Sequence, residues 1–246
     1  SEGVCSQSSQ RVDDDPDDFG GIITISADEE ATDPPVPIQA DGRIVFVGRD
    51  MELQRDLRNF TGSHYSEALN QWAAEQSKST KSRKLSIGLS LLTSSFDMDT
   101  YQKGLSHVVL RNNKAQRPTE DNLRETRDGI LKSLDQLERN GAKEVVINVP
   151  TRFFSDRYAA IVVITAVINH IKRNTTDRSI RHYHIVDTKG RCLDELRVWL
   201  KHAKEMKCHA DVEKLIDRIA MKRTDERVVQ LGSGEVNVQL GERRRS

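Results

Sequence analysis

The sequence predicts an α/β protein, a three-layer α/β/α sandwich with a mixed, largely parallel central sheet. From about residue 20, strand patterns and helix patterns follow one another in the order β, β, α, β, β, α, β, α, β, α. The helical segments run for about 12 to 15 residues, a length that suits crossovers between parallel strands. The middle strands are apolar on both faces, as expected where helices cover a sheet from both sides.

The first half of this domain contains four expected strands and one helix. Residues 22–25 and 43–47 are the first two strands. The segment "SHYSEALNQWAAEQ" is predicted to be a helix, because Leu69, Trp72 and Ala73 share one face at the i, i+3, i+4 spacing. "LSIGLSLLTSS" and "LSHVVLRN" supply two further strands.

The second half begins with the clearest helix, residues 119–141. Thr119 is expected to cap its start and Gly141 to end it. Its apolar stripe comprises Leu123, Ile130, Leu134 and Leu137.

Two more strand and helix pairs complete the pattern. A strand at Val145–Val149 precedes a helix at Tyr158–Ile171. A strand in "RSIRHYHIVDT" then precedes a helix in "CLDELRVWLKHAKEM". That last helix is expected to bury Leu193, Leu196 and Leu200.

The composition predicts flanking segments on either side of one domain. Residues 1–19 are expected to be a disordered acidic tail or linker, and residues 20–208 the α/β/α domain. Residues 209–246 are predicted to form a C-terminal helix and a hairpin-like segment around "GSG", or the start of a further domain. The chain is therefore interpreted as part of a larger, multidomain protein.

Charge, apolar runs and cysteines indicate which partners and which cell compartment to expect. Lys+Arg and Asp+Glu both total 38, so a basic nucleic-acid platform is not expected. No apolar run reaches the length of about 18 to 20 residues that spans a bilayer. The three cysteines (Cys5, Cys192 and Cys208) have no ligand spacing, which indicates a reducing compartment, cytoplasmic or nuclear.

The sequence carries no strong catalytic or cofactor motif. No cofactor and no metal ligand set is expected. His182 and His184 share one face of a predicted strand, which would suit a metal pair or a proton shuttle. The favoured interpretation is a half-exposed edge-strand face without either role.

The candidate site residues lie after strands. Asp28 and Asp187 follow the first and last strands, where ligands of open α/β sheets bind. Either carboxylate could point into a ligand pocket, where Asp28 could read an exocyclic amine, or could cap the next helix or turn. The loop "PTRFFSD" contains Arg152 and Phe153 just before a helix N-terminus, where phosphate can bind. Because the loop lacks glycine, packing of its phenylalanines between sheet and helix is the slightly favoured alternative.

Taken in order, these segments resemble a macro domain, an ADP-ribose-recognising α/β/α module. "GIITISADEE" resembles the strand that ends in the adenine-reading Asp, here Asp28, and "GRIVFVGRD" resembles the strand before the first ligand loop. "LRETRDGILKSLDQLERNGAKEVVINVP" is the best match, and the resemblance covers about residues 21–205. It departs from the family at the ligand loops, where Phe46 and Arg49 replace asparagines, one glycine (Gly62) remains of three, and the second loop is "TRFFSD".

The resemblance implies a non-catalytic macro-like recognition module that binds ADP-ribose, an ADP-ribosylated protein or a related nucleotide, weakly or in altered form. The alternative is a macro-like scaffold with a closed pocket that contacts other protein domains. An ADP-ribosyl hydrolase is a third interpretation, which the missing asparagines disfavour. The expected ligand-binding residues are Asp28, Gly48, Arg49, Gly62, Ser63, Thr151, Arg152, Phe153 and Asp187.

Overall fold

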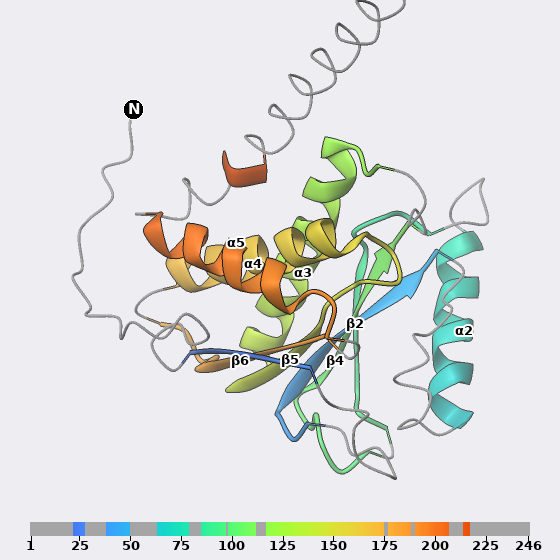
Figure 1. Ribbon diagram of the computed structural model, residues 1–246. Coiled ribbons are helices and arrows are strands. Elements are labelled where there is room, and N and C mark those ends of the chain that lie inside the picture. The colour runs from blue at the N-terminus through green and yellow to red at the C-terminus, as the bar shows by residue number, and fades with distance from the viewer. Residues whose placement is uncertain are drawn as a thin grey trace, which may run out of the picture.

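The computed structural model confirms all ten expected elements in their predicted order (Figure 1). It describes residues 22–27, 38–49, 63–78, 85–96, 98–111, 117–174, 177–187, 190–206 and 214–216. The strands are β1 (Ile23–Ser26), β2 (Gly42–Gly48), β3 (Ser90–Thr93), β4 (Gly104–Leu110), β5 (Glu144–Asn148) and β6 (His182–Val186). The helices are α2 (Ser63–Lys78), α3 (Glu120–Arg139), α4 (Asp156–Arg173) and α5 (Leu193–Glu205).

The six strands form one mixed sheet in the order β1-β6-β5-β2-β4-β3. Every neighbouring pair is parallel except β3 and β4, which are antiparallel. The sheet is therefore the mixed, largely parallel one that the sequence predicts. Its parallel strands all end at one edge, and this geometry brings the loops after β1, β2, β5 and β6 together.

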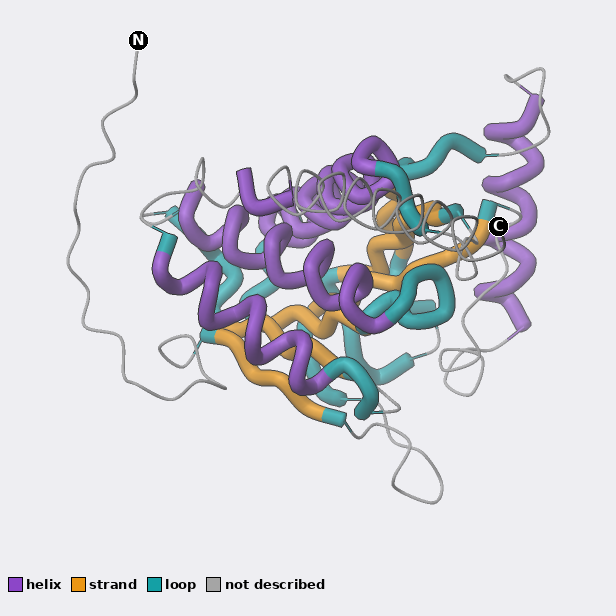
Figure 2. The backbone as a smooth tube through the Cα atoms, turned by 45° about the horizontal axis from the view of Figure 1, so that its top comes forward, coloured by secondary structure: helices purple, strands orange, loops and turns teal. Residues whose placement is uncertain are grey.

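Alternation along the strands sends side chains into two apolar layers. Ile44 and Phe46 of β2 belong to the layer under α3, α4 and α5, whereas Val45 and Val47 face the layer that contains Tyr65 of α2. Figures 1 and 2 show α2 apart from the other three helices. The molecule is thus the three-layer α/β/α sandwich that the sequence predicts.

Helix α3 follows its sequence signals closely. The Thr119 side chain accepts a hydrogen bond from the backbone N–H of Asn122 at 3.2 Å, so Thr119 is the expected N-cap. The helix ends at Arg139, and Gly141 beyond it has a positive φ of 78°. Its predicted stripe is buried in full: Leu123, Ile130, Leu134 and Leu137.

The structure corrects the predicted position of one strand and the predicted burial of two side chains. Strand β6 is not at the edge of the sheet, because β1 pairs with the side of β6 that faces away from β5. Leu69 and Leu196 are buried as predicted, but Trp72 and Leu193 are only partly buried against their layers. The acidic tail and the hairpin-like segment lie outside the described residues.

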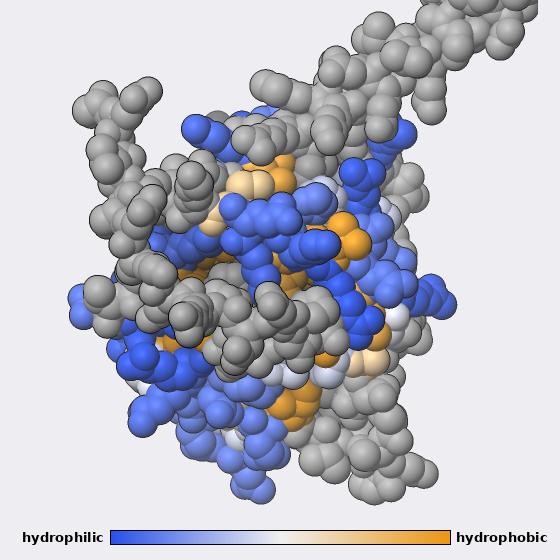
Figure 3. All heavy atoms as spheres, turned by 60° about the vertical axis from the view of Figure 1, so that its left-hand side comes forward, coloured by the Kyte–Doolittle hydropathy of each residue, from blue (hydrophilic) through white to orange (hydrophobic). Residues whose placement is uncertain are grey.

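The described surface is mainly polar. Figure 3 shows one face that is largely hydrophilic, with apolar side chains visible in small separate areas. Among the described residues, Val198 of α5 is the exposed large hydrophobic side chain, at 50% exposure. No helix in the described part of the chain has the length and apolarity to cross a membrane.

Candidate functional site

The candidate ligand site is the edge where the parallel strands end, called here the carboxyl edge. It comprises the described residues that follow β1, β2, β5 and β6: Ala27, Arg49, residues 149–155 and residues 187 and 190–192. In open α/β sheets this edge is where ligands bind, because loops converge there and helix N-termini point toward it.

The loop after β5 is held by its own phenylalanines. The backbone N–H groups of Phe153 and Phe154 both donate to the carbonyl of Pro150 at 3.1 Å, which forms a tight turn. Both rings lie in the layer beneath α4, with 1% and 3% of their surface exposed. The loop is therefore anchored from below, and packing is the role that the structure gives these rings.

Arg152 and Thr151 remain at the surface of this anchored turn. Both are partly buried, and the guanidinium of Arg152 lies 5.8 Å from the ring centre of Phe153. A cation over an aromatic face is attracted by the negative potential of the ring. Phe153 thus supports Arg152 from beneath and restricts where its charge can lie.

The N-terminus of α4 follows directly. Ser155 is its N-cap, but its side chain makes no capping hydrogen bond, unlike that of Thr119 in α3. The first amides of a helix have no partner inside the helix, and they carry a partial positive charge. Asp156 in the first turn already places a carboxylate near this charge, so an anionic ligand would share the position with it.

Asp187 holds the turn between β6 and α5. It is 2% exposed, and its Oδ2 accepts a hydrogen bond from the backbone N–H of Cys192 at 2.6 Å. Its backbone N–H donates to Ser26 of β1 at 3.0 Å, and its carbonyl accepts from Gly190 at 2.9 Å. Of the two roles considered for Asp187, these contacts favour the cap of a turn.

The remaining predicted residues belong to other segments of the chain. Gly48 is the buried last residue of β2, and Nε of the following Arg49 donates to the carbonyl of Leu85 at 2.7 Å. Ser63 is the first residue of α2. Asp28 and Gly62 lie outside the described residues. Gly48, Arg49, residues 151–153 and Asp187 thus lie at the carboxyl edge, on separate loops, whereas Ser63 begins the helix whose Tyr65 contacts Phe96, beyond the other end of β4.

Cys192, at the start of α5, is a poor nucleophile. Burial raises the pKa of its thiol well above the usual range, and the nearby carboxylate of Asp187 raises it further. The sulfur instead donates to the carbonyl of Asp156 at 3.5 Å. A thiol held in its protonated form does not attack a substrate.

Comparison with solved structures identifies the fold. No protein-family model and no curated protein matches the sequence. A macrodomain of Oceanobacillus iheyensis is similar at a TM-score of 0.59 and 10% identity, over 74% of this chain and 93% of that one. The macro domain of ganglioside induced differentiation associated protein 2 gives 0.54 and 12%, over 72% and 83%. A Trypanosoma brucei macrodomain in complex with ADP-ribose gives 0.51 and 13%, over 77% and 71%.

The chain therefore has a macro-domain fold, as its segment pattern predicted. The likeness is one of backbone arrangement, since the sequences share only 10 to 13% identity. At such low identity the likeness establishes the fold alone.

Sequence reasoning missed a buried polar pair beneath α2. Tyr65 of α2 is hydrogen-bonded to Nε2 of His107 on β4, and Nδ1 of His107 lies 3.0 Å from the carbonyl of Leu91. Because a carbonyl only accepts, Nδ1 carries the proton and the Tyr65 hydroxyl donates to Nε2. Burial lowers the pKa of His107 to about 4 and raises that of Tyr65, so both are neutral.

A second buried network fixes the last residue of β5. Arg43 of β2 is fully buried, and its Nη1 donates to the Tyr101 hydroxyl at 2.7 Å. Its Nη2 donates to Oδ1 of Asn148 at 2.5 Å. A buried guanidinium is tolerated only where such acceptors meet it. The alternation of side chains along β2 predicts that Arg43 shares a face with Val45 and Val47, but only the order of the strands in the sheet identifies its partners.

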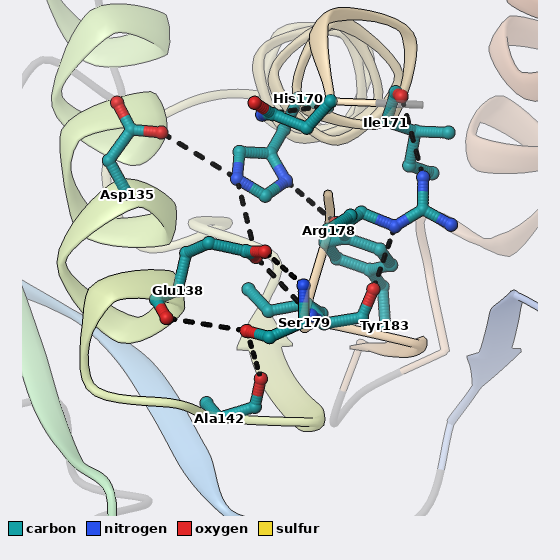
Figure 4. A network of polar contacts seen from close by, with 10 residues as sticks. Asp135, Glu138, Ala142, His170, Ile171, Arg178, Ser179 and Tyr183 are labelled. Atoms are coloured by element: carbon teal, nitrogen blue, oxygen red, sulfur yellow. Dashed lines mark hydrogen bonds and ion pairs between the residues drawn. The ribbon is translucent and has the colours of Figure 1, made fainter. Parts of the chain in front are cut away.

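The third network lies at the other end of α4, away from the carboxyl edge (Figure 4). His170 of α4 is hydrogen-bonded through Nδ1 to the Tyr183 hydroxyl at 2.6 Å, and its Nε2 lies 3.6 Å from Asp135 and 3.8 Å from Glu138. Glu138 also accepts from the backbone of Ser179. These contacts tie α3, α4 and the segment before β6 together, which is a structural role.

Proposed function

We propose that this domain is a non-catalytic recognition module for ADP-ribose or a related nucleotide, with the ligand at the carboxyl edge. The observation that carries the proposal is the turn at residues 150–155, which holds Arg152 over a buried ring beside the N-terminus of α4. Solved macrodomains of the same fold include one in complex with ADP-ribose and one in complex with ADP. The ligands of those proteins are the reason to test ADP-ribose and related nucleotides first.

Phosphate recognition would rest on a side chain rather than on a backbone cradle. A loop that wraps a diphosphate through its N–H groups needs glycine, so that the ligand can approach closely, and "TRFFSD" has none. The Arg152 guanidinium can instead bind a phosphate through two hydrogen bonds, with the α4 amides contributing positive potential. Weak binding is expected, because one guanidinium takes the place of several backbone N–H groups.

The other ligand contacts follow from position. Asp28, after β1, would read the exocyclic amine of adenine, and Thr151 and Arg49 would contact ribose or phosphate oxygens. Phe153 would act through Arg152, since its ring is 1% exposed. We further propose that the domain works inside the cell within a multidomain protein, where ADP-ribosylated proteins are available as partners.

Hydrolysis is not part of this proposal. The first loop has Arg49 in the place where the family has an asparagine, and Cys192 is held as a thiol.

A second function is supported by one specific observation. Phe153 and Phe154 are both buried in the layer beneath α4, as they would be if the pocket had closed. In that case the domain is a scaffold that contacts other protein domains and binds no nucleotide.

Calorimetric titration separates the two functions. Wild type and Arg152→Ala are titrated with ADP-ribose, ADP and AMP, with the exposed Arg181→Ala at the opposite end of the sheet as the charge-matched control. We expect wild type to bind with a dissociation constant between the micromolar and the millimolar range. Arg152→Ala should weaken this affinity about tenfold, and Arg181→Ala should leave it unchanged. Asp28→Ala should weaken all three ligands, because all three contain adenine.

The first outcome below decides between the two functions, and the others test the role of Arg152. Absence of heat with every ligand at millimolar concentration supports the closed scaffold and refutes the recognition module. Binding that is equal in wild type and Arg152→Ala refutes the phosphate assignment. A loss that is equal for AMP and ADP-ribose would place Arg152 on the α-phosphate, whereas a loss confined to ADP and ADP-ribose would place it on the second phosphate.

A further inference from the structure

A group of three potential metal ligands lies on the sheet face that also carries α2, over β5 and β6. His182 and His184 of β6 and Glu144 of β5 each offer one ligand atom, and these atoms all lie within 4.8 Å of one another. The parallel register pairs Glu144 with His182, and this pairing brings the carboxylate beside the two rings. The grouping therefore follows from the sheet itself and not from a loop.

The two rings are already arranged side by side. Their centres are 4.1 Å apart and their planes differ by 18°, so they are stacked. The hydroxyl of Thr24 on β1 is hydrogen-bonded to Nε2 of His182 and fixes the orientation of that ring. Such support from a neighbouring side chain is what orients histidine ligands in metal sites.

One ligand atom has no partner of its own. Nε2 of His184 is buried and has no hydrogen-bond partner among the described residues. Oε2 of Glu144 lies 3.7 Å from this nitrogen, which is too long for a hydrogen bond. A buried polar nitrogen that lies close to a carboxylate, with a gap between them, is a position that a cation can fill.

We propose that Glu144, His182 and His184 form a transition-metal site of the Zn²⁺ class. Two imidazoles and one carboxylate are a common zinc ligand set, with a fourth position left for water or another ligand. Zinc bonds of about 2.0 to 2.2 Å bring tetrahedral ligand atoms to roughly 3.4 Å from one another, so the set must contract slightly. The Glu144 side chain is 49% exposed and has room to make that movement.

The ion would join β5 to β6 and, through Thr24, restrain β1. Its site lies at the start of β6, about 13 Å along the strand from Val186 at the carboxyl edge. Metal binding is therefore independent of nucleotide binding, and failure of one leaves the other standing.

The test titrates Zn²⁺ into protein in which Cys5 and Cys208 are replaced by serine, so that these thiols cannot bind the metal. In this test, wild type means this serine background, and every variant is made in it. We expect one equivalent bound at micromolar affinity or tighter, weakened more than about tenfold in His182→Ala and in His184→Ala. Glu144→Gln should weaken binding about tenfold, because the amide is a neutral and poorer ligand. His202→Ala on the exposed face of α5 is the matched control and should bind as wild type does.

Two further readouts keep the result decisive. Co²⁺ in place of Zn²⁺ should give the strong visible absorption of a four-coordinate ion. Zn²⁺ should raise the melting temperature of wild type but not of a variant in which His182 and His184 are both replaced by alanine. Circular dichroism checks that each variant is folded. The proposal is overturned if wild type binds no Zn²⁺ at about 100 µM, a concentration that a three-ligand site would saturate. It is also overturned if His182→Ala and His184→Ala, both folded, bind as wild type does.

Discussion

Acid should destabilise this domain through His107, the histidine buried beneath α2. Its pKa is lowered to about 4 by burial, whereas the same side chain in the unfolded chain has a pKa of about 6.5. Between these values the unfolded state binds a proton that the folded state does not, so stability falls as pH falls from about 6.5 toward 4. From pH 7.5 to pH 5.0 this one group should remove about 2 kcal/mol from the free energy of unfolding.

The assay is urea unfolding followed by tryptophan fluorescence. Trp72 lies on α2 and Trp199 on α5, so the two tryptophans report on both helical layers. His107→Gln keeps an acceptor for Tyr65 and a donor for Leu91 but does not titrate. Its unfolding free energy should therefore fall by about 2 kcal/mol less than that of wild type over the same pH interval.

The comparison of slopes isolates His107 from other acid effects. Carboxylates elsewhere titrate in both proteins and cancel in the difference. His64→Gln, an exposed histidine one residue before Tyr65, is the matched control and should keep the wild-type slope. Parallel curves for wild type and His107→Gln between pH 7.5 and 5.0 would refute the reasoning.

Three substitutions test the packing and the polar network, each by urea unfolding. Gly129→Ala in α3 should lose about 1 to 3 kcal/mol despite the better helix propensity of alanine, because its Cβ would lie 2.8 Å from Cγ1 of Val108; equal or greater stability would contradict this close approach. Asn148→Ala should lose about 2 to 3 kcal/mol, since it removes a hydrogen-bond acceptor from the buried Arg43; no loss would show that the guanidinium is satisfied without it. Phe154→Ala should lose about 3 to 5 kcal/mol if the ring fills the core as its 3% exposure indicates; a loss below about 1 kcal/mol would mean that the ring packs loosely.

Periodicity and capping were enough to predict the elements and their order. The stripe of α3 and its Thr119 cap are local signals, and they depend on residues three or four positions apart. The apolar character of 43–47 predicted a strand covered on both sides, and β2 is buried throughout. Patterns of this kind can be read from the sequence because each depends only on a short stretch of chain.

Sheet order and register are not local, and the residues that depend on them were missed or misplaced. His182 and His184 were correctly expected on one face, but β6 was assigned to an edge because nothing in its own sequence indicates that β1 pairs with it. Glu144 was not connected with these histidines, since only the register of β5 against β6 brings them together. The same holds for Asn148 and Arg43, on neighbouring strands about a hundred residues apart in sequence.

The sequence predicts where the candidate site residues lie in the fold better than it predicts what their side chains do. The loop at 150–155 does lie at the carboxyl edge, before α4. Asp187 was placed there too, but its carboxylate caps a turn, a use that sequence position alone cannot separate from ligand binding.

The pairing of β1 with β6 also sets the timing of folding on the ribosome. Ile23 pairs with Tyr183, so at 5 to 20 residues per second β1 waits roughly 10 to 30 s for its partner strand to be synthesised. Until then β1 has no neighbour in the sheet. When β6 emerges, β1 pairs with the row of backbone groups on the side of β6 that faces away from β5. A chain that lacks β1 would keep that row open permanently, and an open sheet edge is where one copy can add to another.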